Sequence, residues 1–328
     1  MASRRSRLGE TMAVQITVRW IESGVLRSDG LDSLPEKLSG AVWIDVLEPD
    51  EDSLAAVASL FDLPPLAVED CLHFPQRPKI DVYPHVTFLV WLLPHVVTGD
   101  GVESSELDVF LGPEHLVTVH RERISAVTRV AENAEEFMNR GVEWTLHAIL
   151  DAAVDGVFPV VESLSDELET LEDLMLADAR PANLQRLYAA KRSLVQLHKV
   201  VGPERDVIRG LARLEAFVEP EAYMYFQDIG DHLARVADEV DTYREVASGT
   251  MDIYLSSVSN RMNAIMKQLT IIATIFMPLT LISGIYGMNV LKGMWPPVDA
   301  AWAFPAIMAS MSAITVWMLW YFKRRDWW

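Results

Sequence analysis

The sequence predicts an α+β membrane protein, in which an α/β domain is followed by a long helix and a membrane-spanning helical hairpin. Two runs near the end, Gln268–Leu291 and Ala300–Phe322, contain no charged side chain. Each is long enough to cross the hydrocarbon core as a helix, which takes about 20 apolar residues. Gly287, Pro296 and their neighbours separate the two runs and predict a loop. Before these runs the chain alternates between strand-like and helix-like patterns.

The sequence predicts an α/β domain with a mixed sheet for residues 13–143. Period-two alternation or a short apolar run marks five expected strands: Val14–Trp20, Ala41–Val46, Val86–Leu93, Leu107–Leu111 and His115–Val119. Gly112-Pro113 separates the last two and indicates a hairpin. Asp50–Leu60 and Pro65–Cys71 predict short helices, because Pro49 and the acids that follow it suit a helix start.

The following residues, 144–219, predict antiparallel helices. Val142–Asp178 has apolar residues at helical spacing and is strongly acidic from Glu162 onward. Asn183–Val200 carries the complementary basic residues, so the two faces are expected to pair. After Pro220, helical pattern continues to Tyr286 and predicts one helix roughly 100 Å long at 1.5 Å per residue. Alone in water such a helix is not stable, so it must pack against other helices or the α/β domain.

Charge is distributed unevenly along the chain. The formal net charge is −19, yet residues 259–328 carry six basic and two acidic side chains. The acidic N-terminal part argues against nucleic acid as a partner, because nucleic-acid binding requires basic surfaces. Arg261 and Lys267 precede the first apolar run, and Lys323–Arg325 follow the second. By the positive-inside rule, both chain ends and the acidic domain face the cytoplasm, while the loop between the spans faces out.

One face of the long helix is unusual because its residues are small, polar or methionine at a bundle seam's four-three spacing. They are Asp252, Ser256, Ser259, Asn263, Met266, Thr270, Ala273, Met277, Thr280 and Gly284, called here the polar stripe. Polar groups at membrane depth face a bundle interior or water. The spacing suits two arrangements equally: a water-filled pore surrounded by several chains, or a close helix–helix seam.

At Tyr286-Gly287-Met288-Asn289 the sequence resembles the CorA family of magnesium channels, whose signature is Gly-Met-Asn at the outer end of the first span. The preceding MPLTLIS and the closing YFKRRDWW also resemble that family. Further upstream, similar segments are Val68–Asp81, Asp151–Asp173 and Tyr225–His232, so the resemblance covers most of the chain.

The resemblance implies a homopentamer in the inner or plasma membrane, with a cytoplasmic α/β funnel and a pore lined by the long helix. Gly287, Met288 and Asn289 would form the selectivity filter. A ring of neutral amides suits magnesium, which holds its water shell tightly and prefers oxygen partners. The implied pore-lining and gate positions are Thr280, Met277, Leu269, Asn263 and Asp252. Met277 and Leu269 would close the path by dewetting.

The resemblance also implies regulation by the transported ion. Asp70 and Asp228 match family positions that bind divalent cations between neighbouring subunits, and Glu69 is a further candidate ligand. Two carboxylates across an interface repel each other unless a cation lies between them. High internal Mg²⁺ would then hold the subunits together and the pore shut. Mg²⁺ is thus expected both as transported and as regulatory ion.

One segment departs from the family. The family loop commonly reads Met-Pro-Glu-Leu soon after the signature, whereas this chain has Met294-Trp295-Pro296-Pro297 and no glutamate there. Asp299 lies nearby at a different position. We therefore expect weaker capture of cations at the outer mouth.

The sequence thus predicts a channel that imports magnesium, and also cobalt or nickel, down the electrochemical gradient. The alternatives are a proton-coupled zinc transporter on the same scaffold and a membrane-tethered metal sensor or scaffold. No Gly-rich phosphate loop or nucleophile elbow is present, so neither a nucleotide partner nor an enzymatic activity is expected. The predicted segments are a basic disordered tail (1–12), the α/β domain (13–143), the antiparallel helices (144–219), the stalk with the first span (220–286), the outer loop (287–299), the second span (300–322) and the basic C-terminus (323–328).

Overall fold

The computed structural model describes residues 14–35, 40–97, 101–214, 217–288, 300–325 and 327. The chain divides into two compact units, residues 1–251 and 252–328. Asn289, the rest of the loop to Asp299 and the expected tail 1–12 lie outside the described residues. Each unit is described by itself.

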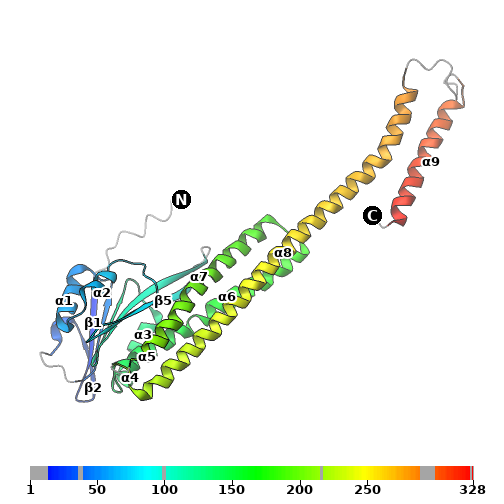
Figure 1. Ribbon diagram of the computed structural model, residues 1–328. Coiled ribbons are helices and arrows are strands. Elements are labelled where there is room, and N and C mark those ends of the chain that lie inside the picture. Colours follow the sequence, from blue (N-terminus) through cyan, green and yellow to red (C-terminus); the bar gives the residue numbers. More distant parts are fainter. Residues whose placement is uncertain are drawn as a thin grey trace. The chain divides into compact units, whose positions relative to one another are not determined.

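Unit 1 is built on a seven-stranded mixed sheet (Figure 1). Its strands, in the order β2-β1-β3-β7-β6-β5-β4, are Val25–Asp29, Gln15–Glu22, Val42–Leu47, His115–His120, Gly101–Leu111, Thr87–Val97 and Lys79–Val82. β3 and β7 pair in parallel and all other neighbours are antiparallel. The predicted mixed sheet and the β6–β7 hairpin are confirmed, and Gly112 N closes the hairpin onto His115 O at 2.8 Å.

Helices cover both faces of this sheet. On one face, α1 (Glu51–Phe61) and α2 (Pro65–Asp70) bury Leu54, Val57 and Ala67 against alternate strand residues. Both helices were predicted. Asp50 caps α1, since its Oδ1 accepts from Ser53 N at 2.8 Å and its own N–H donates to Ser53 Oγ at 3.0 Å. A short 3₁₀ turn, Leu31–Ser33, lies near β1.

The other face is covered by helices from the middle of the chain, as Figure 1 shows. They are α3 (Ser125–Glu132), α4 (Ala134–Met138), α5 (Val142–Asp155), α6 (Phe158–Ala177) and α7 (Pro181–Leu211). The helical pattern predicted over Val142–Asp178 is divided between two helices, because the chain breaks between α5 and α6. Pro159 lies in the first turn of α6, where proline's missing N–H costs nothing. The expected pairing of faces occurs: Arg186 Nε and Nη2 donate to the two carboxylate oxygens of Glu167 at 2.9 and 2.8 Å.

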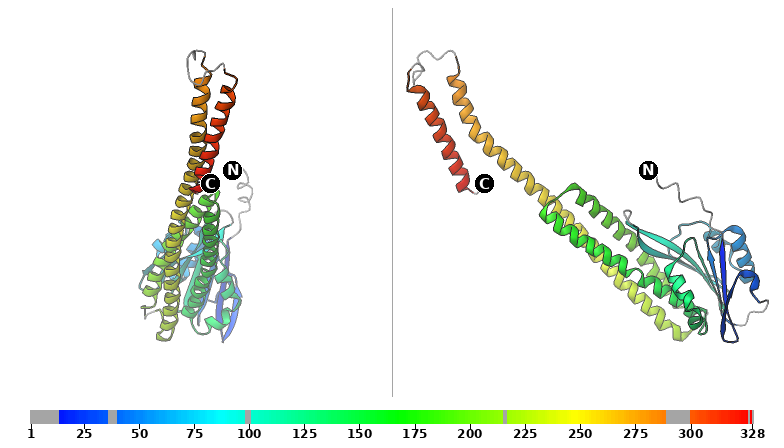
Figure 2. Two further views of the ribbon diagram at one scale, coloured as in Figure 1. Left: turned by 90° about the vertical axis from the view of Figure 1, so that its right-hand side faces the viewer. Right: turned by 180° about the vertical axis from the view of Figure 1, so that it is seen from behind.

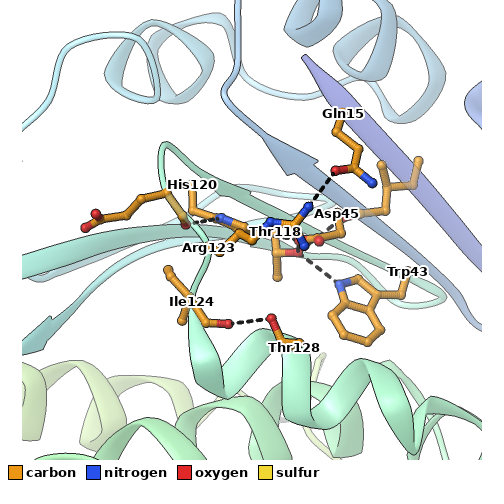
Figure 3. A network of polar contacts seen from close by, with 10 residues as sticks. Gln15, Trp43, Asp45, Thr118, His120, Arg123, Ile124 and Thr128 are labelled. Atoms are coloured by element: carbon orange, nitrogen blue, oxygen red, sulfur yellow. Dashed lines mark hydrogen bonds and ion pairs between the residues drawn. The ribbon is translucent and has the colours of Figure 1, made fainter. Parts of the chain in front are cut away.

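A buried polar network ties β3 to β7 on the same face (Figure 3). Trp43 Nε1 donates to Thr118 Oγ1 at 3.0 Å, and Thr118 Oγ1 donates to Asp45 Oδ1 at 2.6 Å. His120 Nε2 lies 2.9 Å from the same Asp45 oxygen. Because each polar group has a partner, the network fixes the register of the two parallel strands without a large burial penalty.

α8 (Pro220–Tyr286) is one continuous helix of 67 residues, as the sequence predicted. In Figures 1 and 2, its first part lies alongside α6 and α7. It buries an apolar face there: Ala222, Phe226, Ile229, Leu233, Val236, Val240 and Ala247 are all fully buried. The boundary between the two units falls within this helix, after Met251.

Unit 2 consists of the remainder of α8 and the antiparallel α9 (Ala303–Arg324), which lie side by side in Figures 1 and 2. Ile271 and Ile275 of α8 pack against Phe322 of α9, with Leu279 and Met318 at the edge of the contact. Among the described residues, three helical segments are long and apolar enough to cross a membrane: Val142–Ala177, α8 and α9. The most apolar window of the first is 61% buried, whereas those of α8 and α9 are 11% and 6% buried.

Candidate functional site

The polar stripe is exposed in the single chain. All ten of its residues, listed above from Asp252 to Gly284, are exposed, although several of them are apolar. Ile271 and Ile275, which contact α9, lie on the opposite side of α8 at 100° per residue. The hairpin therefore buries one face of α8 and leaves the stripe without a partner inside its own chain.

The hydroxyl groups of the stripe threonines are already engaged as donors. Thr270 Oγ1 donates to Met266 O at 2.7 Å, and Thr280 Oγ1 donates to Phe276 O at 2.8 Å. Each hydroxyl oxygen keeps lone pairs that can accept further hydrogen bonds. The exposed face of α8 thus presents acceptor oxygens, which suit the water shell of a cation better than an anion.

The two predicted gate residues differ from these threonines in chemistry. Met277 is 71% exposed and Leu269 is 58% exposed, so both apolar side chains project away from the α8–α9 contact. Asn263 and Asp252 are exposed further toward the boundary of the unit. Of the predicted filter, Gly287 N donates to Ser283 O at 2.9 Å, and Met288 follows with an exposed side chain. Asn289 itself is outside the described residues.

Asp70 ends α2 and makes an ion pair that was not expected. Lys79 Nζ on β4 lies 2.6 Å from Asp70 Oδ2 and 2.8 Å from Asp81 Oδ2. Burial lowers the pKa of Lys79, but its hydrogen bonds to Asp70 and Asp81 outweigh this and raise that pKa above its usual range. Glu69, beside Asp70, is exposed, and its backbone oxygen contacts His73 Nδ1 at 2.8 Å.

Two acidic side chains with raised pKa values, Asp108 and Glu106, lie near Asp70. Burial raises the pKa of Asp108 well above its ordinary value, and the charge of Glu106 acts in the same direction. Burial also raises the pKa of Glu106, although its Oε2 accepts from Gln76 N at 2.6 Å. The thiol of Cys71 has a raised pKa for the same reason. Burial thus disfavours the charged forms of all three groups.

Asp228 lies on the first part of α8 and is 68% exposed. His232 Nε2, one turn further, is 3.8 Å from Asp228 Oδ2. Across from it on α5, burial raises the pKa of Asp151, with the charges of Asp155 and Asp228 adding to the rise. Burial lowers the pKa of His147, whose ring stands edge-on to Phe226. In the sequence, the spacing that indicates this cluster is the two i, i+4 pairs of histidine and aspartate, His147–Asp151 and Asp228–His232.

The two predicted regulatory carboxylates are not brought together within one chain. In the part of the chain that the structure describes, no hydrogen bond or ion pair joins Asp70 to Asp228. In the same part, no group of three or more His, Cys, Asp or Glu side chains is placed to hold a metal ion. A cation held at either carboxylate would therefore complete its coordination with water or with other oxygen ligands.

The comparisons with known proteins decide the family. The family model described as "CorA-like Mg2+ transporter protein" matches residues 39–324. The chain is 36% identical over 297 residues to the cobalt/magnesium transport protein CorA of Thermotoga maritima, covering 88% of this chain and 84% of the relative. It is also 30% identical over 318 residues to the putative metal ion transporter YfjQ of Bacillus subtilis, covering 96% and 98%.

The chain belongs to the CorA-like Mg²⁺ transporter family. Its fold agrees, since the solved CorA magnesium transporter of Methanocaldococcus jannaschii superposes with a TM-score of 0.84 at 26% identity. That match covers 95% of this chain and 98% of the solved one. Both the polar stripe and Asp70 lie inside the region that the CorA family model matches, so the site residues belong to the shared part of the fold.

Proposed function

We propose that this chain is a subunit of a homopentameric channel that imports Mg²⁺, and also Co²⁺ or Ni²⁺, through the inner or plasma membrane. The observation that carries this proposal is the polar stripe, exposed on the face of α8 opposite α9. Serine, threonine and asparagine at membrane depth avoid lipid. Several copies around a common axis would place the stripe inward, and the exposed apolar faces of α8 and α9 would meet lipid or neighbouring helices.

Two membrane spans per chain fit the burial pattern. The most apolar window within Val142–Ala177 is largely covered by the packing of unit 1, whereas the most apolar windows of α8 and α9 are only 11% and 6% buried. Lipid would cover that surface at no cost. Lys267 and Lys323–Arg325 then lie on the cytoplasmic side, together with both termini.

The chemistry of the stripe suits a hydrated divalent cation. Mg²⁺ gives up its water shell reluctantly, so neutral oxygens that accept hydrogen bonds from this water can select it without trapping it. Thr280 and Asn263 supply such oxygens along the pore, and Asn289 with Gly287 and Met288 forms the outer filter. Leu269 and Met277 form dry rings that close the path when neighbouring helices approach. The membrane potential supplies about 4.6 kcal/mol per divalent ion at 100 mV.

Regulation follows from Asp70, Asp228 and Glu69, which lie on the surface of unit 1. Side chains of Asp70 and Asp228 are 31% and 68% exposed, so a neighbouring subunit can reach both. Carboxylate oxygens are ligands that Mg²⁺ prefers. When internal Mg²⁺ is high, cations held between subunits would stabilise the closed assembly, and depletion would shift the population toward the open one.

Flux measurement in liposomes tests the channel. Wild-type protein should carry Mg²⁺ along its gradient without a pH gradient, and Asn289→Ala should reduce this flux at least about 100-fold, since every subunit loses its filter amide. Val290→Ala, one residue further, is the matched control and should retain flux. Unchanged flux in Asn289→Ala would contradict the filter assignment. Zinc flux that requires a proton gradient would instead favour a zinc transporter, and no flux of any ion would favour a tethered sensor.

A further inference from the structure

The ion pair at Asp70 bears on the proposed regulation. Lys79 Nζ is held by two carboxylates at once, at 2.6 Å from Asp70 Oδ2 and 2.8 Å from Asp81 Oδ2. Its position is further fixed because the ammonium lies 5.3 Å from the centre of the Phe88 ring. β4 pairs with β5, which fixes the backbone of Lys79 opposite Val90. A cation that belongs to the protein therefore already occupies an oxygen of the proposed regulatory carboxylate.

This ammonium is a permanent charge at physiological pH. Its hydrogen bonds to Asp70 and Asp81 raise the pKa of Lys79 despite the opposing effect of burial. Among the described residues, the carboxylates that pair with this ammonium are those of Asp70 and Asp81, and neither Glu106 nor Asp108 forms an ion pair with it. Lys79 thus interacts with the same carboxylate that a divalent cation would seek.

We propose that Lys79 is a tethered competitor that a divalent cation must displace from Asp70, so that it sets the internal cation concentration at which the channel closes. This inference rests on the proposed regulation through Asp70. An ammonium and a divalent ion on one carboxylate repel each other at contact distance. Asp81 gives the ammonium a second partner, so Lys79 can leave Asp70 without losing all of its pairing.

A purely structural role for Lys79 predicts the opposite result. If Lys79 only holds Asp70 in position, its removal loosens the site and weakens cation binding. If Lys79 competes, its removal strengthens binding, because Asp70 loses a rival cation and keeps its charge. The sign of the change therefore separates the two roles.

The experiment uses the full-length protein and two readouts. In detergent, Mg²⁺ is titrated while resistance to chymotrypsin is followed. In liposomes, internal Mg²⁺ is titrated while Mg²⁺ flux is followed. In Lys79→Met, which removes the charge but keeps a side chain of similar length, the Mg²⁺ concentrations for half-maximal protection and half-maximal inhibition should each fall about threefold or more, the size expected from one partly exposed ion pair. Lys79→Gln serves as a second neutral variant in case the first does not fold, and Lys79→Arg should stay within about twofold of wild type.

Arg77→Gln is the matched control, since Arg77 is exposed, carries the same charge and lies two residues away. An unchanged or higher midpoint in the neutral Lys79 variants would overturn the inference alone. An equal fall of the midpoints in Arg77→Gln would also overturn it, because loss of any nearby positive charge would then have the same effect as loss of Lys79. If the wild-type protein shows no response to Mg²⁺ in either readout, the proposed regulation fails and this inference fails with it.

Discussion

Apolar helical segments differ sharply in burial between the two units. In unit 1, the most apolar window of Val142–Ala177 is 61% buried against the sheet and its neighbours. In unit 2, the corresponding windows of α8 and α9 are 11% and 6% buried. Composition alone does not separate these helices, but packing does. Unit 1 completes its core within one chain, whereas unit 2 needs lipid or further copies of the chain to cover its surface.

The largest expected effect is a difference in the free energy of unfolding when one apolar side chain is truncated in each unit. Phe226 is fully buried, so Phe226→Ala should lower the free energy of unfolding by about 3–5 kcal/mol. Met277 is 71% exposed, so Met277→Ala should change the stability of the fold by less than about 0.5 kcal/mol. Denaturant unfolding of the purified protein measures both. Similar losses in the two variants would break the comparison.

Acid should destabilise unit 1 through His115. Burial lowers the pKa of His115 to about 4, and its ring stacks on Phe61 with a centroid distance of 4.4 Å. The unfolded chain takes up the proton near pH 6.5, which the folded state resists. Stability is therefore complete above about pH 6.5 and falls as the pH drops toward 4, by about 3 kcal/mol in all.

Unfolding of wild type and His115→Phe between pH 7 and 4.5 measures this effect. The variant replaces the imidazole by a ring that cannot titrate, so its stability should fall less over this range. An identical pH dependence in the two proteins would show that other groups cause the acid sensitivity.

A smaller effect is expected on the inhibition of ion flux by internal Mg²⁺. Asp70→Lys and Asp228→Lys each place a positive charge where the proposed regulatory cation binds, so the internal Mg²⁺ concentration for half-inhibition should rise at least about tenfold. Liposome flux against internal Mg²⁺ measures this, with Asp32→Lys, an exposed acid of the 3₁₀ turn, as the charge-matched control. Inhibition retained at the wild-type midpoint in both variants would contradict control of the pore by unit 1.

Periodic signals made much of the fold predictable. The uninterrupted pattern after Pro220 predicted α8, and alternation predicted the main strands. The first half of β6, near Gly101–Ser105, was missed because its few apolar residues give it little alternation. The break before α6 was missed although Pro159 marked it. The contact of Lys79 with Asp70 joins β4 to the end of α2, and no local pattern encodes a contact set by tertiary packing.

Cys71 has a practical consequence for all of these questions. It is the only cysteine of the chain, it is fully buried, and burial raises the pKa of its thiol well above the ordinary value. Alkylating reagents attack the thiolate, so the native thiol should stay silent in the folded protein. Cysteines introduced one by one along α8 would then be the reactive ones. The wild-type chain is thus a ready background for mapping which helix positions water reaches.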